Sequence, residues 1–181
     1  MEKITAILIE KGDTYPKIVM ERLTLGFFDE IIVETNCPSI YRRYELAKQA
    51  KNSVCYFQDS DCLVNYQQLY KHFDGRLTNT MTLPFQQKYE QMGCTLVGWG
   101  CYIKKDMVDN AFVPYIEKYG IDDPHLLREA DRIFTYRNKP FNTIIMPHED
   151  LFQDENRMSS PANVEFHFQS ANEALRKCSL L

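Results

Sequence analysis

Residues 54–64 read Val54-Cys55-Tyr56-Phe57-Gln58-Asp59-Ser60-Asp61-Cys62-Leu63-Val64. A short apolar run here ends in two aspartates one residue apart, and a segment of helical pattern precedes it. Such a run is typical of a buried strand in an α/β sheet. Ligands of open α/β sheets bind beyond the carboxyl ends of the strands. We therefore expect Asp59 and Asp61 to face a ligand site.

Two carboxylates at this spacing can bind one divalent cation. Oxygen ligands suit Mg²⁺ or Mn²⁺, and the phosphates of a substrate would supply the remaining ligands. Asp-Ser-Asp is also ordinary turn chemistry, and Asp61 can instead cap a helix over residues 62–73. The motif alone leaves both interpretations open.

Composition indicates one folded domain. The chain has 181 residues, of which 44% are hydrophobic and 25% charged, as in ordinary globular proteins. The net charge of −4 gives no electrostatic footprint for non-specific binding to nucleic acids. No glycine-rich phosphate-binding motif occurs among the 7 glycines.

The spacing of the cysteines and the hydropathy pattern indicate the cellular compartment of the protein. None of the 6 cysteines forms a C-x-x-C pair, no apolar run approaches membrane-spanning length, and the first residues lack a secretory pattern. We expect a reduced, cytoplasmic protein with no transmembrane segment and without disulfides.

The first half alternates strand and helix. Apolar runs at 4–9, 30–34 and 54–59 predict strands, and the segments 15–25 and 40–50 predict helices between them. Such alternation gives two right-handed βαβ units and a parallel sheet. The first half is therefore expected to be one half of a doubly wound nucleotide-binding fold.

The second half is less regular. Residues 77–83 predict a strand that suits an edge of the sheet, residues 84–93 are polar and irregular, and residues 95–103 predict a strand broken by Gly98-Trp99-Gly100. Glycines on both sides of an aromatic residue let the backbone approach a ligand. A β-bulge around a core tryptophan explains the same pattern, and both interpretations stay open.

The last part of the chain predicts two helices, one strand and a tail. The helices are expected at 107–119 and 124–134 and the strand at 141–146, with a short helix at 171–178 in the tail. Asp122-Asp123 precedes the second helix, so helix capping alone can explain both acids.

The order of these parts resembles that of the GT-A glycosyltransferases over residues 4–151. In that family an Asp-x-Asp at the end of a strand holds the metal and the diphosphate, and Asp59-Ser60-Asp61 matches it. A glycine-bearing segment that lines the donor and acceptor space is similar to Gly98-Trp99-Gly100. An acidic pair that supplies a catalytic base is similar to Asp122-Asp123, and a histidine after the last core strand matches His148.

The resemblance implies an α/β fold with one Rossmann-like GT-A domain, whose central sheet is mostly parallel and flanked by helices. The catalytic domain is expected over residues 1–152, with a nucleotide-binding half at 1–75 and an acceptor half at 76–152. Residues 153–181 are expected to form a tail that packs on this domain.

The implied activity is that of a metal-dependent hexosyltransferase. It would move a sugar from a nucleoside diphosphate sugar, expected to be a UDP-sugar, to a hydroxyl of a glycan or of a hydroxymethylated base of viral DNA. Mn²⁺ or Mg²⁺ held by Asp59, Asp61 and His148 would act as a Lewis acid on the diphosphate. Asp123 or Asp122 would deprotonate the acceptor hydroxyl.

The resemblance also implies a set of substrate contacts. Trp99 would bind the acceptor. The residues expected to bind the donor are Ile9, Glu10, Thr35, Asn36, Arg43, Asp59, Ser60 and Gly98.

Two other functions remain open on the sequence. A phosphatase of the haloacid dehalogenase type also uses Asp-x-Asp, but on its first strand, whereas the motif here ends the third. An inactive nucleotide-sugar-binding scaffold would keep the fold without turnover. His148 taken alone is more often a surface or structural histidine. The stereochemistry of transfer and the oligomeric state are not predicted.

Overall fold

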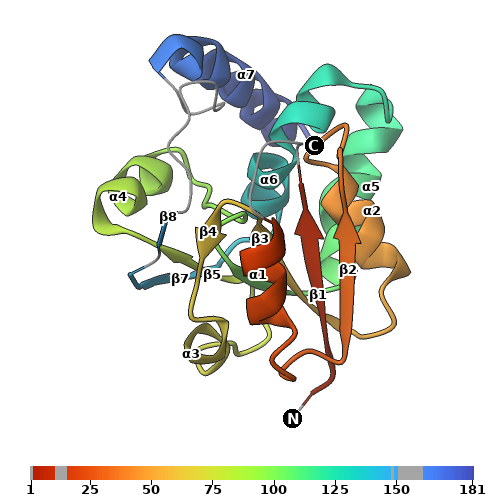
Figure 1. The fold of residues 1–181 in the computed structure, drawn as a ribbon. Helices are drawn as coiled ribbons and strands as arrows, with labels where there is room; N and C mark the ends of the chain where they lie inside the picture. The colour runs from red at the N-terminus through yellow and green to blue at the C-terminus, as the bar shows by residue number, and fades with distance from the viewer. Residues whose placement is uncertain (1, 11–15, 148, 151–160) are drawn as a thin grey trace.

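The computed structural model describes residues 2–10, 16–147, 149–150 and 161–181 (Figure 1). A six-stranded sheet of order β2-β1-β3-β6-β5-β7 carries helices on both faces, and β4 and β8 form a separate two-stranded ladder. In chain order the helices and strands are β1 (Ile4–Ile9), α1 (Pro16–Leu23), β2 (Glu30–Glu34), α2 (Arg42–Gln49), β3 (Val54–Asp59), β4 (Cys62–Leu63), α3 (Tyr66–Tyr70), β5 (Thr78–Met81), α4 (Leu83–Gln91), β6 (Cys101–Lys104), α5 (Asp106–Tyr119), α6 (Pro124–Arg137), β7 (Asn142–Ile145), β8 (Glu149–Asp150) and α7 (Pro161–Ser179).

The first three strands of the sheet have the bounds that the apolar runs predict. β1 pairs in parallel with both β2 and β3, and Ile9 lies opposite Glu34 on one side and Asp59 on the other. The three strands therefore end at the same level. The predicted βαβαβ half is confirmed.

The other strands complete a mostly parallel sheet, as predicted. β6 runs antiparallel to β3 and to β5, and β7 runs parallel to β5. Every strand of the sheet except β6 therefore points its carboxyl end to the same edge. The strand at β5 was expected at an edge of the sheet, but it lies between β6 and β7.

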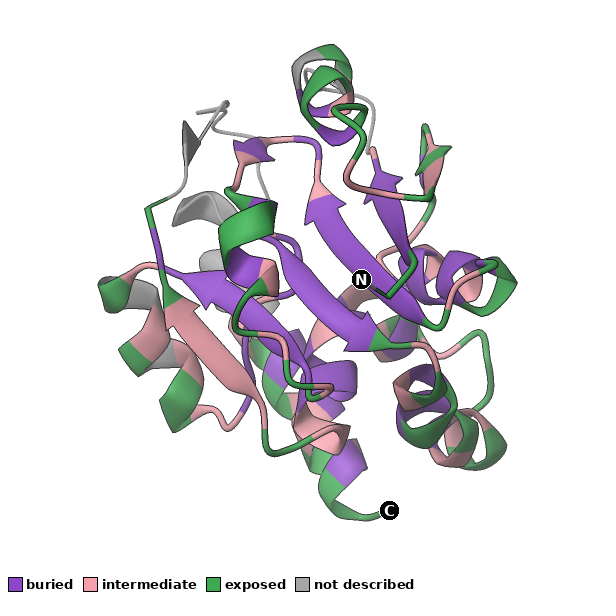
Figure 2. Cartoon of the chain, turned by 90° about the horizontal axis from the view of Figure 1, so that it is seen from below, coloured by how far each residue is buried: buried purple, intermediate pink, exposed green. Residues whose placement is uncertain are grey.

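Burial follows the sheet, whose central strands β1 and β3 are buried almost throughout, while the edge strand β7 is mostly half-buried (Figure 2). An aromatic cluster fills the face covered by α2, α5 and α6, where Tyr44 packs against Phe57, Phe112 and Phe134. A second cluster around Tyr56 fills the face covered by α1 and α3. Aromatic contacts of this kind account for much of the core.

In the second half one predicted irregular segment is a helix, and two predicted elements have other bounds. Residues 84–93, expected to be irregular, contain most of α4, which has Pro84 in its first turn and ends before Gly93 with φ +64°. Proline fits a first helical turn, and glycine tolerates positive φ, so both residues favour this helix. The strand expected at 95–103 is confined to β6, and the helix expected at 171–178 extends over the whole of α7.

α7 packs along α6 and joins the core. Ala174 and Cys178 of α7 belong to the same buried cluster as Ile133 and Phe134 of α6. All six cysteines of the chain are buried thiols. Within the described residues, no helix has both the length and the apolar character to span a bilayer.

The alternative role of Asp61 as a helix cap is wrong. Asp61 lies in the turn between β3 and β4, and the following helix is the short α3. Its cap is Asn65, whose side-chain oxygen accepts a hydrogen bond of 3.0 Å from the Gln68 N–H. Asp61 is therefore not engaged in capping this helix.

Replacing Asn65 with alanine should lower the free energy of unfolding by about 1 kcal/mol, because a helix N–H loses its acceptor. Urea unfolding measures the change. Gln68→Ala is the matched control, since Gln68 is exposed in the same helix and its backbone N–H remains. An equal loss in both variants would contradict the assignment of the cap.

Candidate functional site

The carboxyl ends of β1 and β2 bring four predicted donor-binding residues together. Backbone hydrogen bonds join the two strand ends. The Glu10 N–H donates to the Glu34 carbonyl at 2.9 Å, and the Cys37 N–H donates to the Glu10 carbonyl at 2.8 Å. Thr35 and Asn36, which follow β2, are exposed, and the backbone of Asn36 has φ +55°. The four residues are Ile9, Glu10, Thr35 and Asn36.

Asp59, at the end of β3, is held in one position. Its N–H donates to the Gly98 carbonyl at 2.7 Å, and its Oδ1 accepts from Arg43 Nη2 at 2.5 Å. A Cβ atom on Gly98 would lie 2.0 Å from Asp59 Oδ2, so only glycine leaves room for this carboxylate. The Asp59 side chain remains 37% exposed, and can therefore still reach a ligand.

Arg43 contributes a buried charge to the site. Its side chain is 3% exposed, and its Nε lies 3.6 Å from Asp131 Oδ1 on α6. Burial alone would lower the pKa of Arg43, but the carboxylates of Asp131 and Asp59 outweigh it and raise this pKa above its usual value. Arg43 was expected to bind the donor; in the structure its guanidinium contacts the carboxylates of Asp59 and Asp131.

Tyr44 fixes the other end of this charge network. Its hydroxyl donates to Asp131 Oδ1 at 2.7 Å, and its ring is fully buried in the aromatic cluster. Asp131 is thus held by a rigid side chain and by Arg43. The network runs from Tyr44 through Asp131 and Arg43 to Asp59.

A buried glutamine braces the turn that contains the two aspartates. Gln58 accepts a hydrogen bond from the Tyr56 hydroxyl at 2.7 Å and donates one to the Cys62 carbonyl at 2.8 Å. Ser60, between the aspartates, is also buried. Because the residues before and after the turn are joined through one side chain, the turn geometry is fixed from inside.

The short ladder of β4 and β8 brings the segment that follows β7 close to the aspartates. Cys62 pairs with Asp150 and Leu63 with Glu149. His148, the predicted third metal ligand, lies outside the described residues. Its chain neighbour Glu149 is nevertheless paired with a residue only two positions beyond Asp61.

Asp123 is used as a helix cap, as the simpler interpretation predicted. Its Oδ1 accepts hydrogen bonds from the His125 N–H at 3.0 Å and from the Leu126 N–H and the Tyr115 hydroxyl at 3.1 Å, and its Oδ2 pairs with Lys177. Burial works to raise the pKa of Asp123, but the bonds from Lys177 and Leu126 prevail and lower it. Asp122, the other predicted base, is exposed.

Gly98-Trp99-Gly100 is part of a turn that leads into β6, and neither the predicted broken strand nor a bulge inside it forms. Gly100 has φ +99°, and a Cβ there would lie 2.9 Å from the Tyr56 hydroxyl and 3.0 Å from Val64. Both glycines therefore allow close packing against the aspartate turn. Trp99 between them is half-buried.

The residues available as metal ligands form part of a site for a divalent cation. Asp59 and Asp61 offer carboxylate oxygens, which suit Mg²⁺ or Mn²⁺ with a diphosphate and water as further ligands. Among the residues that the structure describes, no group of three acids, histidines or cysteines forms a complete metal site.

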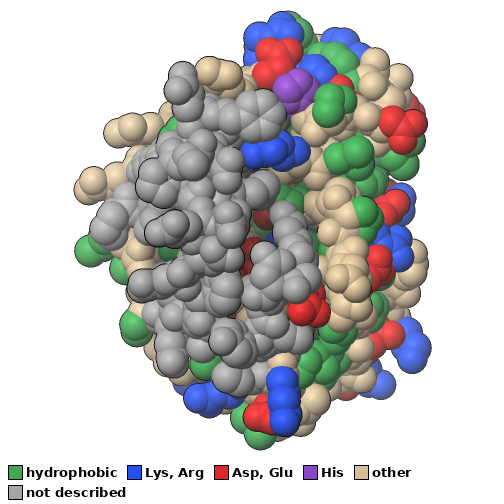
Figure 3. Space-filling model, turned by 45° about the horizontal axis from the view of Figure 1, so that its top comes forward, with side chains coloured by type: hydrophobic (Ala, Val, Ile, Leu, Met, Phe, Trp, Pro, Cys, Tyr) green, Lys and Arg blue, Asp and Glu red, His purple; other side chains and the backbone are tan. Residues whose placement is uncertain are grey.

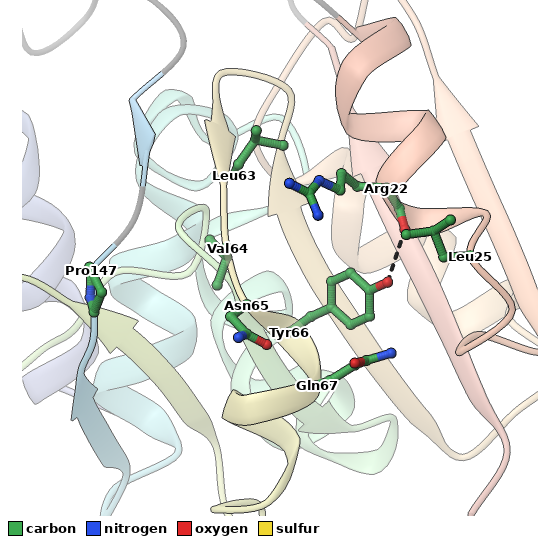
Figure 4. Close-up of a pocket in the computed structure, with 8 residues that line it drawn as sticks. All are labelled: Arg22, Leu25, Leu63, Val64, Asn65, Tyr66, Gln67 and Pro147. Atoms are coloured by element: carbon green, nitrogen blue, oxygen red, sulfur yellow. Dashed lines mark hydrogen bonds between the residues drawn. The ribbon is translucent and has the colours of Figure 1, made fainter.

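A pocket of about 520 Å³ lies beside the segment that follows the aspartates (Figure 4). The Arg22 side chain points across it toward Leu63, and the Tyr66 hydroxyl donates to the Arg22 carbonyl at 2.9 Å. Its volume lies within the range of small-molecule sites. The lining residues are Arg22, Leu25, Leu63, Val64, Asn65, Tyr66, Gln67 and Pro147.

Two residues of the site were missed by sequence reasoning. A glutamine inside an apolar strand run is a usable signal, because a buried amide needs partners, and it would have pointed to Gln58. Asp131 gives no such signal, since a lone acid on an amphipathic helix is usually solvated. Only the packing of α6 against α2 shows it.

Comparison with solved structures identifies the fold. Glucosyl-3-phosphoglycerate synthase from Mycobacterium tuberculosis, in complex with Mn²⁺, UDP-glucose and phosphoglyceric acid, superimposes with a TM-score of 0.57 at 10% identity, over 98% of this chain and 80% of that chain. The same enzyme with Mg²⁺ and UDP gives a TM-score of 0.53 at 10% identity, with the same coverage. A197 from STIV gives 0.51 at 13% identity, over 84% of this chain and 87% of that chain.

No family model matches the sequence, and a comparison with curated proteins gave no match. Identities this low show the fold alone. The chain therefore has the GT-A fold that the order of its parts implied.

Gly98→Ala should lower the free energy of unfolding by about 1–3 kcal/mol, because the new methyl group would displace the Asp59 carboxylate. In an Asp59→Ala background most of this loss should disappear, since the clashing atoms are gone. A double-mutant cycle from urea unfolding measures the coupling. Equal losses in both backgrounds would show that the Gly98–Asp59 contact is not the cause.

Asp123→Asn should destabilise the protein by about 1–2 kcal/mol at neutral pH, because a charged cap and its bond to Lys177 are weakened. The pKa of Asp123 is lowered in the folded protein. Its contribution is therefore complete above the unfolded-state pKa of about 3.9 and is lost as the pH falls through the folded value.

Denaturant unfolding of wild type and Asp123→Asn between neutral pH and pH of about 2 tests this dependence, because the difference should shrink in the acid range. Asp122→Asn, in the exposed neighbour, should change little at any pH. A wild-type-to-variant difference that is independent of pH would refute the electrostatic account of Asp123.

Proposed function

We propose that this protein is a metal-dependent glycosyltransferase that uses a nucleoside diphosphate sugar, with UDP as the carrier and a hexose as the sugar. The GT-A fold supports a transferase of this class, since the similar solved structures contain UDP or UDP-glucose with Mn²⁺ or Mg²⁺. The level ends of β1, β2 and β3 support a nucleotide site at this edge of the sheet. The buried thiols support a reducing compartment such as the cytoplasm.

One observation carries the proposal: the pairing of β4 with β8. Through Leu63 and Glu149 it joins the aspartate turn to the segment that follows the last strand of the sheet. His148 directly precedes β8 in the sequence, and we retain it, as the resemblance implied, as the proposed third ligand beside Asp59 and Asp61. Two carboxylates and an imidazole, together with diphosphate oxygens, make a suitable set for Mn²⁺.

The chain's own residues have distinct roles in this proposal. Asp59, fixed by Arg43 and Gly98, and Asp61 hold the cation, which when bound neutralises the diphosphate leaving group. Ile9, Glu10, Thr35 and Asn36 bind the nucleoside at the ends of β1 and β2, and the buried Ser60 keeps the two carboxylates apart.

The base is assigned within the acidic pair that precedes α6. Asp123 already accepts three hydrogen bonds and forms an ion pair with Lys177. Asp122 is the acid of the pair whose side chain is exposed to solvent. A general base needs a free lone pair within reach of the acceptor hydroxyl. We therefore retain Asp122 as the candidate base and treat Asp123 as its support.

A small hydroxylated acceptor is favoured over DNA. The pocket lined by Asn65 and Gln67 offers amide donors and acceptors near the aspartate turn, and the half-buried Trp99 is the proposed aromatic contact for a sugar ring. On the described part of the top face, acidic and basic side chains are interspersed (Figure 3). Duplex DNA instead favours a continuous basic surface.

The test is a thermal shift assay with UDP in the presence and absence of Mn²⁺. Wild-type protein should be stabilised only by the two together, by about 2.7 kcal/mol at a UDP concentration one hundred times the dissociation constant. Asp61→Asn should lose this stabilisation. Asp109→Asn, an exposed acid paired with Lys48, should keep it.

Incubation with labelled UDP-sugars then separates an enzyme from a scaffold. Release of UDP that requires Mn²⁺ and Asp61 is expected of the glycosyltransferase. Binding of UDP without turnover of any UDP-sugar would favour the scaffold, and failure of UDP and Mn²⁺ to bind would refute the proposed function.

A further inference from the structure

The buried guanidinium of Arg43 creates an electrostatic problem for a cation site. It contacts Asp59, one of the two proposed ligands, at 2.5 Å. An arginine stays protonated in proteins, so its charge is permanent. A positive charge this close to a ligand repels a divalent cation and, taken alone, would cancel the charge of Asp59.

Asp131 supplies the compensating charge. Its Oδ1 lies 3.6 Å from Arg43 Nε, while Asp59 lies on Nη2 of the same guanidinium. The three side chains together carry one net negative charge, since two carboxylates share one guanidinium. Asp131 is only 21% exposed and is fixed by Tyr44, so neither solvent nor side-chain motion removes this charge from the site.

We propose that Asp131 is a positioning residue for the cation site, which offsets the charge of Arg43 so that Asp59 keeps its negative charge for the metal. This inference rests on the proposed function. Arg43 then holds Asp59 in place, and Asp131 compensates the positive charge of Arg43. Asp131 acts through Arg43, and its loss should weaken the binding of a cation without removing a ligand.

The experiment is a titration with Mn²⁺ at fixed UDP concentration, in which the electron paramagnetic resonance signal of free Mn²⁺ reports binding. Asp131→Asn should raise the dissociation constant of Mn²⁺ roughly tenfold, because the charge of Arg43 is then no longer offset and cancels that of Asp59. Asp109→Asn removes one carboxylate from an exposed ion pair on α5 and should leave the constant unchanged. Circular dichroism checks that each variant is folded at the temperature used.

A double variant separates charge from structure. In Arg43→Gln/Asp131→Asn both charges are gone and Asp59 keeps its own charge, so the dissociation constant should fall at least about threefold below that of Asp131→Asn. If Asp131 is instead a direct ligand or only a packing residue, the double variant will bind as weakly as Asp131→Asn or more weakly, and the inference fails. The double variant leaves no unpaired buried cation, so it remains informative where Asp131→Asn does not fold.

The outcomes also distinguish this inference from the function on which it rests. Wild-type protein that binds Mn²⁺ with UDP, together with Asp61→Asn that does not, supports the proposed function. Asp131→Asn that binds like the wild type would then overturn the inference alone. Absence of Mn²⁺ binding by the wild type would overturn both.

Discussion

The parallel strands β1, β2 and β3 end at the same level of the sheet, and the rest of the structure depends on this constraint. Ile9 lies opposite both Glu34 and Asp59, so a slip of one residue in either pairing would turn every side chain of that strand to the other face. The apolar faces of the sheet, filled by aromatic clusters on both sides, oppose such a slip. The burial of the core thus also sets where Asp59 leaves the sheet.

The strand pattern and the aspartate turn were predictable because their signals are local. Residues 4–9, 30–34 and 54–59 are apolar runs between helix signals, and β1, β2 and β3 have those bounds. Their order implied the GT-A fold, which the solved structures confirm. The cap at Asp123 was equally readable, since an aspartate before Pro124 is a common helix start. Short-range rules determine these features, so one sequence suffices to find them.

The contacts that shape the site were not predictable in the same way. Arg43 was expected to bind the donor, yet the packing of α2 against α6 directs it to Asp59 and Asp131. Gly98 was expected to let a ligand approach the backbone. In the structure the Asp59 carboxylate occupies the space that a side chain at position 98 would need. α4 was missed because its sequence is polar, although Pro84 and Gly93 mark its two ends. For Arg43 and Gly98 a partner distant in the chain decides the outcome, and no local pattern encodes that partner.

The ladder between β4 and β8 has only two residue pairs, and a two-stranded ladder of that size contributes little stability by itself. A ligand that contacted both strands would therefore favour the paired ladder, and pairing would in turn favour that ligand. The apparent affinity for such a ligand would fall with the fraction of molecules in which the two strands are not paired. Substitutions in these two strands would thus tune affinity from outside the set of residues that contact the ligand.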